Sequence, residues 1–300
     1  MIERHEIAVL IPAYARPDRL AACLDALAVQ DGGPYRVHVV DDGSPASLRE
    51  VCERHPFVRY HRQENAGPAA ARNAGARAAR DAGGRILCFT DDDCRPRPGW
   101  VRALTAAIRE DGTRLVGGRV ENALSENAYA EASQSLNDYL YDYFGAEDGT
   151  APFFTSNNMG CTLEAFEAIG GFDESFPLAA AEDRDFGLRW GAGNGPLHYA
   201  PDAIVDHAHP LDLKRFWRQH ANYGRGACHL RRIMADQEGR DGGFEAARFY
   251  AGLVFHPLRR AEPGALRRTA LMGLSQVAMV AGYLDERKSG RRGALPTKDT

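Results

Sequence analysis

Apolar runs alternate with amphipathic segments through the first third of the chain. Four short apolar runs predict strands, at 7–11, 37–40, 58–61 and 86–89. Segments with helical periodicity follow them and predict helices at 18–28, 48–54, 69–82 and 101–110. Because the predicted strands are apolar throughout, we expect a parallel sheet that is buried under helices on both faces.

The rest of the chain is less regular. It predicts a helix at 129–144, a strand at 153–163, a turn at Gly170-Gly171, a helix that begins near Glu182, and a strand at 197–205 that leads to His207. Helical patterns then cover 213–234, 244–255 and 266–284, before a tail rich in glycine and charge that begins at Asp285. This change of pattern predicts an α/β domain over residues 1–210 and a C-terminal helical extension over residues 211–300.

Polar residues follow three of the four predicted strands closely. They are Pro12-Ala13-Tyr14, Asp41-Asp42-Gly43-Ser44 and Thr90-Asp91-Asp92-Asp93. In open parallel sheets, ligands bind beyond the carboxyl ends of the strands. We therefore expect the three segments to converge on one crevice.

Three consecutive carboxylates, Asp91, Asp92 and Asp93, directly follow one of these strands. Like charges so close together are costly without a cation, and Mg²⁺ or Mn²⁺ bound by carboxylate and phosphate oxygens would offset that cost. A solvated acidic turn is the commoner fate of Asp clusters, but the crevice shared with Asp41 and Asp42 favours a metal site.

Two further segments each allow two interpretations. Asp41-Asp42 is either a turn that caps the next helix or an acceptor for a nucleotide base or ribose. The segment from Gly67 to Gly75 opens either an Ala-rich packing helix or a helix that presents Arg72 and Asn73 to the crevice.

Together these segments resemble the family-2 glycosyltransferases of the GT-A fold, whose motifs run in the same order. The matching segments are Ile11-Pro12-Ala13-Tyr14, Val40 to Ser44, Gly67 to Gly75, Phe89 to Asp93, Gly170-Gly171-Phe172-Asp173-Glu174 and Glu182-Asp183. The resemblance covers most of residues 6–207. It implies an α/β, Rossmann-like mixed sheet with helices on both faces, and an inverting, metal-dependent transfer of one sugar from a nucleotide diphosphate sugar, UDP-linked by preference, to an acceptor hydroxyl.

The resemblance also implies roles for residues of the donor site. Asp42 contacts the base, with Tyr14 beside it, and Asp91 binds the ribose or the metal. Asp93, at the end of the D-x-D motif, binds the Mn²⁺ or Mg²⁺ ion that bridges the diphosphate. Pro12, Arg72 and Asp92 complete the set expected at the nucleotide. The Asn that often follows the Tyr in this family is Ala15 here, which leaves the choice of base open.

The acidic pair Glu182-Asp183 corresponds to the family's catalytic pair. Asp183 is then the general base, with Glu182 near the acceptor or donor sugar. Stabilisation of a helix N-terminus is the other interpretation, and it is compatible with catalysis.

The segment Asp206-His207-Ala208-His209 offers a metal ligand. A lone His is more often structural, and alternation along an extended chain would send both rings to one face. The resemblance favours His207 over His209 as the ligand.

Composition and charge bear on the partner and on the cellular compartment. With 37 Lys and Arg against 41 Asp and Glu, the net charge of -4 argues against a nucleic-acid partner. The six cysteines form no CxxC pair and no signal peptide precedes the first strand, so we expect reduced thiols and a cytoplasmic protein. The acceptor, whether a glycan, lipid, peptide or natural product, is not indicated.

The C-terminal region adds a possible contact with the inner face of a membrane. Its apolar stretch at 269–284 is shorter than the roughly 20 residues that span a bilayer. Basic residues flank it, at Arg259, Arg260, Arg267 and Arg268. A helix packed on the catalytic domain and a peripheral helix at an anionic membrane surface both fit this pattern. The segment Arg218 to Gly226 departs from the Gln-x-x-Arg-Trp pattern of processive synthases, which favours transfer of a single sugar.

Three other functions compete with glycosyl transfer. A sugar nucleotidyltransferase would need a Gly-rich, basic phosphate loop after the first strand, and Pro12 to Arg19 has none. A haloacid dehalogenase phosphatase would need an Asp where this chain has Pro12. A catalytically degenerate nucleotide-binding protein would have no reason to keep carboxylates at 91, 93 and 183.

Overall fold

The computed structural model describes residues 6–31, 35–145, 153–176, 178–193, 195, 197–238, 245–261 and 264–290. The chain forms two compact units. Unit 1 comprises Met1–Ala123, Gly145–Ser175 and Asp183–Ala208, and unit 2 comprises Leu124–Phe144, Phe176–Glu182 and His209–Thr300. The chain therefore enters unit 2 twice before its C-terminal helices begin. The domain boundary expected at residue 210 stays a prediction.

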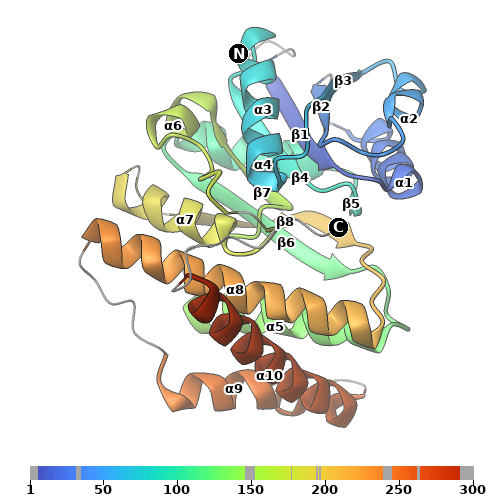
Figure 1. Cartoon of the computed structure of the whole chain (residues 1–300). Helices are drawn as coiled ribbons and strands as arrows, with labels where there is room; N and C mark the ends of the chain where they lie inside the picture. The colour runs from blue at the N-terminus through green and yellow to red at the C-terminus, as the bar shows by residue number, and fades with distance from the viewer. Residues whose placement is uncertain are drawn as a thin grey trace. The chain divides into compact units, whose positions relative to one another are not determined.

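Unit 1 is built on one mixed sheet of eight strands in the order β3-β2-β1-β4-β7-β6-β8-β5 (Figure 1). The strands are β1 (Ile7–Ala13), β2 (Arg36–Asp41), β3 (Val58–Arg62), β4 (Ile86–Thr90), β5 (Cys94–Pro96), β6 (Leu115–Asn122), β7 (Asn158–Thr162) and β8 (Leu197–His207). The first four strands run parallel, as their continuous apolar character predicts. β7 runs antiparallel to both β4 and β6, which makes the sheet mixed.

Helices cover both faces of this sheet. They are α1 (Pro17–Ala28), α2 (Arg49–Glu53), α3 (Pro68–Asp81), α4 (Trp100–Glu110), α6 (Leu163–Ala168) and α7 (Glu182–Gly193). Alternate residues of β1 serve the two faces. Val9 belongs to a core shared with α1, α2 and α4, whereas Leu10 lies against Gly75 of α3 on the other face.

The sequence did not predict β6, because its centre contains two glycines. The structure gives both a reason. A Cβ on Gly117 would lie 1.9 Å from the Phe154 ring, and a Cβ on Gly118 would lie 2.2 Å from the carbonyl oxygen of Ala203. The register with β8 shifts at this point. The glycines therefore mark a close approach rather than a turn.

Smaller differences concern one strand end and one short strand. The strand expected over 153–163 begins at Asn158 and ends at Thr162, whose hydroxyl accepts a hydrogen bond from the backbone N–H of Ala165 and so begins α6. The three-residue β5 is too short to give a periodic signal. Position 244, where a helix was expected to start, and the tail beyond 290 lie outside the described residues.

Unit 2 is helical in its described parts. Its helices are α5 (Ala128–Phe144), α8 (Leu213–Glu238), α9 (Ala247–Arg259) and α10 (Ala265–Gly290). α8 and α10 approach each other closely at glycines: a Cβ on Gly224 or on Gly282 would lie 1.9 Å from a backbone oxygen of the facing helix. The Tyr139 hydroxyl of α5 donates to the carbonyl oxygen of Phe249 in α9. The C-terminal helices expected from the sequence are therefore present. None of the described helices has the length and hydropathy needed to cross a bilayer.

All six cysteines carry free, buried thiols. Five lie in unit 1, and Cys228 lies on α8 in unit 2. Burial raises the pKa of the Cys88 thiol to about 12, so the thiol stays protonated.

Candidate active site

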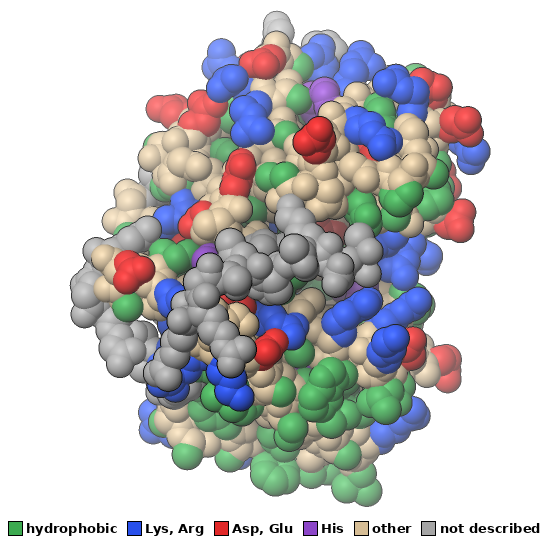
Figure 2. Space-filling view, viewed as in Figure 1, with side chains coloured by type: hydrophobic (Ala, Val, Ile, Leu, Met, Phe, Trp, Pro, Cys, Tyr) green, Lys and Arg blue, Asp and Glu red, His purple; other side chains and the backbone are tan. Residues whose placement is uncertain are grey.

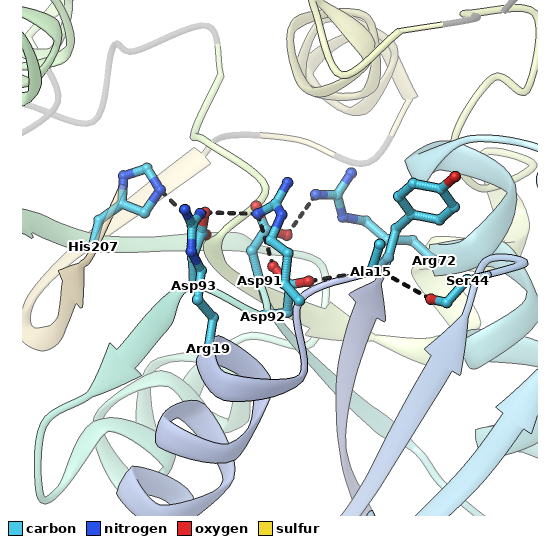
Figure 3. A network of polar contacts seen from close by, with 10 residues as sticks. Ala15, Arg19, Ser44, Arg72, Asp91, Asp92, Asp93 and His207 are labelled. Atoms are coloured by element: carbon cyan, nitrogen blue, oxygen red, sulfur yellow. Dashed lines mark hydrogen bonds and ion pairs between the residues drawn. The ribbon is translucent and has the colours of Figure 1, made fainter. Parts of the chain in front are cut away.

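The acidic triplet, Asp91, Asp92 and Asp93, follows β4 in unit 1 and lies next to arginines of α1 and the turn before it (Figure 3). Asp92 and Asp93 are only 3% and 5% exposed. Arg16 Nη1 donates to Asp92 Oδ1 at 2.9 Å and to Asp93 Oδ2 at 2.8 Å. Arg19 Nη1 donates to the same Asp93 oxygen at 3.3 Å.

Two further basic side chains complete this arrangement. Arg72 Nη2 of α3 donates to Asp91 Oδ1 at 2.7 Å, and His207 Nε2 lies 3.3 Å from Asp93 Oδ1. Each carboxylate of the triplet therefore has a cationic partner within the protein. The sequence predicts that a metal ion offsets the repulsion among the three carboxylates. In the structure arginine side chains already offset it, so this electrostatic argument for a metal is incomplete.

Strand pairing brings His207 to the triplet. β5 follows Asp93 directly and pairs antiparallel with β8, so that Cys94 stands opposite His207. The backbone N–H of Ala208 donates to the Asp93 carbonyl oxygen at 2.8 Å. His209 lies beyond the end of β8 and belongs to unit 2. Of the two histidines proposed as ligands, His207 contacts Asp93.

Asp93 and His207 fit a divalent cation. Two ligand atoms about 2.1 Å from an ion and at right angles to each other are about 3 Å apart, close to the 3.3 Å between Asp93 Oδ1 and His207 Nε2. Asp93, Cys94 and His207 are also the described group whose potential ligand atoms all lie within 4.8 Å of one another. Oxygen and imidazole nitrogen suit Mn²⁺ or Mg²⁺ better than the thiol does.

The electrostatics of the triplet follow from burial and crowding. Burial, opposed by Arg16 and helped by the charges of Asp93 and Asp91, raises the pKa of Asp92 to about 7. Burial alone would lower the pKa of His207, but the adjacent Asp93 carboxylate outweighs it and the net shift is upward. Asp92 and His207 therefore both bind a proton more readily than they would in isolation.

The acidic pair, Asp41 and Asp42, is held differently. Asp41 accepts from the backbone N–H groups of Ser44 and Leu48, from the Tyr60 hydroxyl and from Arg62. Burial alone would raise the pKa of Asp41, but the hydrogen bonds from Ser44, Tyr60 and Leu48 lower it below its usual value.

Asp42, the residue expected at the base, is also bonded within the protein. Its oxygens accept from the Gln63 amide at 2.8 Å and from the backbone N–H groups of Ala66 and Gly67, each at 2.9 Å. A carboxylate has about four lone-pair positions, so most of its accepting capacity fixes the turn that begins α3. Most hydrogen bonds of the acidic pair therefore stabilise turns, as the first of the two interpretations expects.

A short turn after β1 connects the two acidic clusters. Tyr14 donates its backbone N–H to Asp92 Oδ2 at 3.3 Å, and Ala15 donates its own to Ser44 Oγ at 2.9 Å. Ala15 has a φ of 54°, in the left-handed region that favours Gly or Asn. Pro12, the other residue expected at the nucleotide, lies in β1 opposite Val40.

Sequence reasoning missed Arg16 and Arg19. Their signal was present, since arginines three positions apart at a helix start lie on one face. The segment Pro12 to Arg19 lacks the glycines of a phosphate loop, but it carries these two basic residues.

Arg72 and Asn73 point to different partners. Arg72 is 3% exposed, pairs with Asp91 and lies over the Phe172 ring. Asn73 instead exchanges hydrogen bonds with the backbone of Phe172, at 2.8 and 3.0 Å. The space beside Asn73 requires the glycine of the motif, because a Cβ on Gly171 would lie 2.7 Å from Asn73 Oδ1. Asn73 therefore positions the Gly-Gly-Phe segment, and Arg72 serves the triplet.

Glu182 and Asp183 open α7, as expected. Asp183 belongs to unit 1, and its Oδ1 accepts from the backbone N–H of Arg184 at 2.8 Å. Burial raises the pKa of Asp183, opposed by the charges of Arg184 and Arg72. Glu182 is 4% exposed and is the last residue of a segment of unit 2. Asp185, one turn into the helix, pairs with Arg189, which also donates to the carbonyl oxygen of Ile169.

This mixed sheet, with acidic residues beyond its parallel strands, defines the class of the protein. It is the class of nucleotide-diphospho-sugar transferases of the GT-A type. The sequence model of glycosyl transferase family 2 matches residues 8–170, more than half of the chain. The chain therefore belongs to glycosyl transferase family 2, and the resemblance drawn from the motifs is confirmed.

Two curated relatives have similar sequences over part of their length. The Pre-mycofactocin glycosyltransferase of Mycobacterium tuberculosis is 31% identical over 202 residues, covering 65% of this chain and 42% of the relative. Glycosyltransferase AglE of Haloferax volcanii is 33% identical over 122 residues, covering 38% of this chain and 39% of the relative. The matches thus span about two fifths of each relative's length.

Solved structures extend the likeness to nearly the whole chain. The mannosyltransferase PcManGT of Pyrobaculum calidifontis, in complex with GDP-Man and Mn²⁺, has a TM-score of 0.62 at 17% identity, covering 98% of this chain and 78% of that one. S. aureus TarS 1-349 in complex with UDP has a TM-score of 0.54 at 17% identity, covering 98% and 94%. At this identity the likeness concerns the fold, and it confirms the predicted GT-A architecture.

Proposed function

We propose that the protein is an inverting glycosyltransferase that moves one sugar from a nucleotide diphosphate donor, by preference UDP-linked, to an acceptor hydroxyl. The observation that carries this proposal is the acidic triplet beyond β4, with Asp92 and Asp93 buried and Asp93 next to His207, in a chain of glycosyl transferase family 2. The nucleotide complexes of PcManGT and TarS support a nucleotide-linked donor.

In this proposal each cluster binds one part of the donor. The base lies near Tyr14 and the acidic pair, and the ribose lies near Asp91 and Asp92. Asp93 and His207 hold Mn²⁺ or Mg²⁺, with Asp91 near enough in the chain to contribute. When bound, the ion supplies positive charge that offsets the charge left on the departing diphosphate.

Asp183 acts as the general base. Its carboxylate removes the proton of the acceptor hydroxyl while that oxygen attacks the anomeric carbon on the face opposite the leaving nucleotide, which inverts the anomeric centre. The upward shift of its pKa supports this role, because a stronger base accepts the proton more readily near neutral pH. Glu182, next to it in α7, lies with the acceptor or the donor sugar.

The test compares Asp183→Asn with wild type, using a panel of nucleotide sugars and NMR of the product anomer. Asparagine keeps the shape but not the basicity. Donor binding should therefore stay within about twofold, while transfer or donor hydrolysis falls by about 10²- to 10⁴-fold. Asp202→Asn, an exposed carboxylate of the same unit, is the control and should behave as wild type.

Near-normal turnover of Asp183→Asn would remove the base assignment, and a product that retains the donor's anomeric configuration would remove the inverting mechanism. A protein that binds nucleotide sugars but transfers and hydrolyses none would be the degenerate alternative. Release of diphosphate from a nucleoside triphosphate would instead indicate a nucleotidyltransferase.

We further propose that unit 2 contacts an anionic membrane surface. Leu266, Val277, Val280 and Leu284 of α10 are 79%, 59%, 58% and 46% exposed. At 100° per residue, these four positions fall within about 60° of one another, on one face of the helix. Figure 2 shows hydrophobic side chains gathered where α9 and α10 lie, with basic side chains near them. Arg259 and Arg267 are among the exposed basic residues of this region.

Co-sedimentation with vesicles tests this contact. The protein should pellet with phosphatidylglycerol vesicles and stay in the supernatant with phosphatidylcholine, and added salt should release it because electrostatic attraction to lipid is screened. Val277→Asp with Val280→Asp should abolish pelleting. Val29→Asp, at a 67% exposed valine of unit 1, is the control. Binding independent of anionic lipid, or a stable dimer that the two aspartates dissociate, would contradict the membrane surface.

A further inference from the structure

Arginine side chains already compensate the carboxyl groups of the acidic triplet before any ligand binds. Three carboxylates face three guanidinium groups, from Arg16, Arg19 and Arg72. A divalent cation gains most where negative charge is uncompensated. The triplet in this state therefore attracts a free metal ion only weakly.

The three arginines differ in how firmly they are held. The Arg72 side chain is 3% exposed, whereas Arg16 is 41% and Arg19 28% exposed. Arg16 uses a single nitrogen, Nη1, for both of its carboxylate partners. A guanidinium carries five N–H donors and binds phosphate in bidentate fashion. Arg16 thus has the donors and the exposure to exchange carboxylate oxygens for phosphate oxygens.

The two oxygens of Asp93 have different partners. Oδ2 accepts from Arg16 and Arg19, and Oδ1 faces His207. Release of Arg16 would leave Asp93 more negative without removing Arg19, so the carboxylate would keep its orientation toward His207. Asp92 would lose its guanidinium partner in the same step.

We propose that Arg16 is a counter-ion that keeps the divalent cation from binding ahead of the donor and that transfers to the diphosphate when the donor arrives. This proposal rests on the proposed function, because it assumes a metal at Asp93 and a diphosphate beside it. The nucleotide and the ion then bind together, each raising the affinity for the other by the same factor. Arg16 is a positioning residue for the metal, and Arg19 holds Asp93 throughout.

Electron paramagnetic resonance of Mn²⁺, titrated into the full chain with and without UDP, measures this coupling without any turnover. Wild type should bind Mn²⁺ weakly alone and at least tenfold more tightly with UDP. Arg16→Gln should bind Mn²⁺ alone about tenfold more tightly than wild type, since a unit charge about 6 Å from a divalent ion contributes roughly this factor even in water. The gain from UDP should shrink correspondingly.

Three variants make the result specific. Arg16→Lys keeps the charge and should stay close to wild type. Arg102→Gln removes the same charge from an exposed pair with Asp31 and should leave Mn²⁺ affinity unchanged. Asp93→Asn combined with Arg16→Gln should lose the tight binding, which assigns it to this site. Thermal melting checks that each variant is folded.

The proposal is wrong if Arg16→Gln binds Mn²⁺ alone no better than wild type, or if wild type already binds it equally well with and without UDP. Product formation by wild type judges the proposed function separately. If the protein shows this Mn²⁺ pattern but transfers no sugar, the counter-ion role of Arg16 stands and the proposed function fails. If it transfers sugar without this pattern, the proposed function stands and the counter-ion role fails.

Discussion

The acidic pair at the end of β2 and the acidic triplet after β4 flank the same central strand, β1, but they are stabilised by different kinds of donor. Backbone N–H groups and neutral side chains supply most of the hydrogen bonds to Asp41 and Asp42. The triplet instead accepts four hydrogen bonds from arginine side chains.

This difference separates a scaffold from a binding site. A backbone donor cannot leave without unfolding its turn, so the pair is fixed at all times. An exposed arginine can change partners at little cost, so the triplet can accept a ligand without a change of fold. Buried carboxylates beyond neighbouring strands can therefore contribute either to stability or to function, and the donors around them indicate which.

The largest expected effect distinguishes the clusters by activity. Asp93→Asn should lower transfer by at least about 10²-fold, because it removes the ligand that fixes the ion next to the developing charge. Its free energy of unfolding should change far less than that of an Asp41 variant, since Arg16 is 41% exposed and can be solvated. Steady-state kinetics and urea unfolding measure both. An Asp93→Asn protein with full activity would contradict the separation.

The acidic pair should show the opposite behaviour. Asp41 is fully buried and accepts from four groups. Asp41→Asn replaces an acceptor oxygen by an NH₂ donor that faces other donors, which should lower the free energy of unfolding by about 3 kcal/mol. Asp81→Asn, at a 70% exposed side chain, is the control in the same urea titration. A loss below about 0.5 kcal/mol would argue against the scaffold role.

The pH dependence of that loss sharpens the same point. Because the folded protein lowers the pKa of Asp41, its contribution is complete above the unfolded pKa of about 3.9 and disappears as the pH falls through the lower, folded pKa. The difference in unfolding free energy between wild type and Asp41→Asn should stay constant from pH 7 to 5 and shrink below about pH 4. A difference that changes mainly between pH 8 and 6 would point to another group.

The smallest effect concerns the turn that connects the clusters. Ala15 adopts a left-handed conformation that costs alanine about 1 kcal/mol and costs asparagine less. Ala15→Asn should therefore raise the free energy of unfolding by about 0.5 to 1 kcal/mol, measured as a higher melting temperature. Ala46→Asn, an exposed alanine with ordinary negative φ, should give no gain. The Asn common at this position in the family then has a conformational role, which is separate from base selectivity.

Most of the fold could be predicted because its strands and helices have regular apolar patterns. The four apolar runs became β1 to β4, and the long helical patterns became α5, α8, α9 and α10. Prediction failed where a tertiary contact sets the residue type. Gly117 and Gly118 look like a turn in the sequence, but the structure uses them to bring β6 against Phe154 and Ala203.

The site could be predicted only in part. Carboxylates after strands are visible because they interrupt apolar runs, and the triplet, Arg72 and His207 indeed lie in one network. Arg16 and Arg19 look like solvated residues of a surface helix, and their partners lie more than 70 residues away in the chain. Their part in the network depends on strand order, which the local pattern does not contain.

Because every thiol is buried, the native cysteines can report on opening of the folded protein. Reagents that modify cysteine react with the exposed thiolate, so labelling of this chain should follow transient opening rather than surface chemistry. Cys88 lies within the central sheet of unit 1, and Cys228 lies on α8 of unit 2. Mass spectrometry of the labelled peptides would show which thiol reacts first, and so which unit opens faster, without any engineered probe.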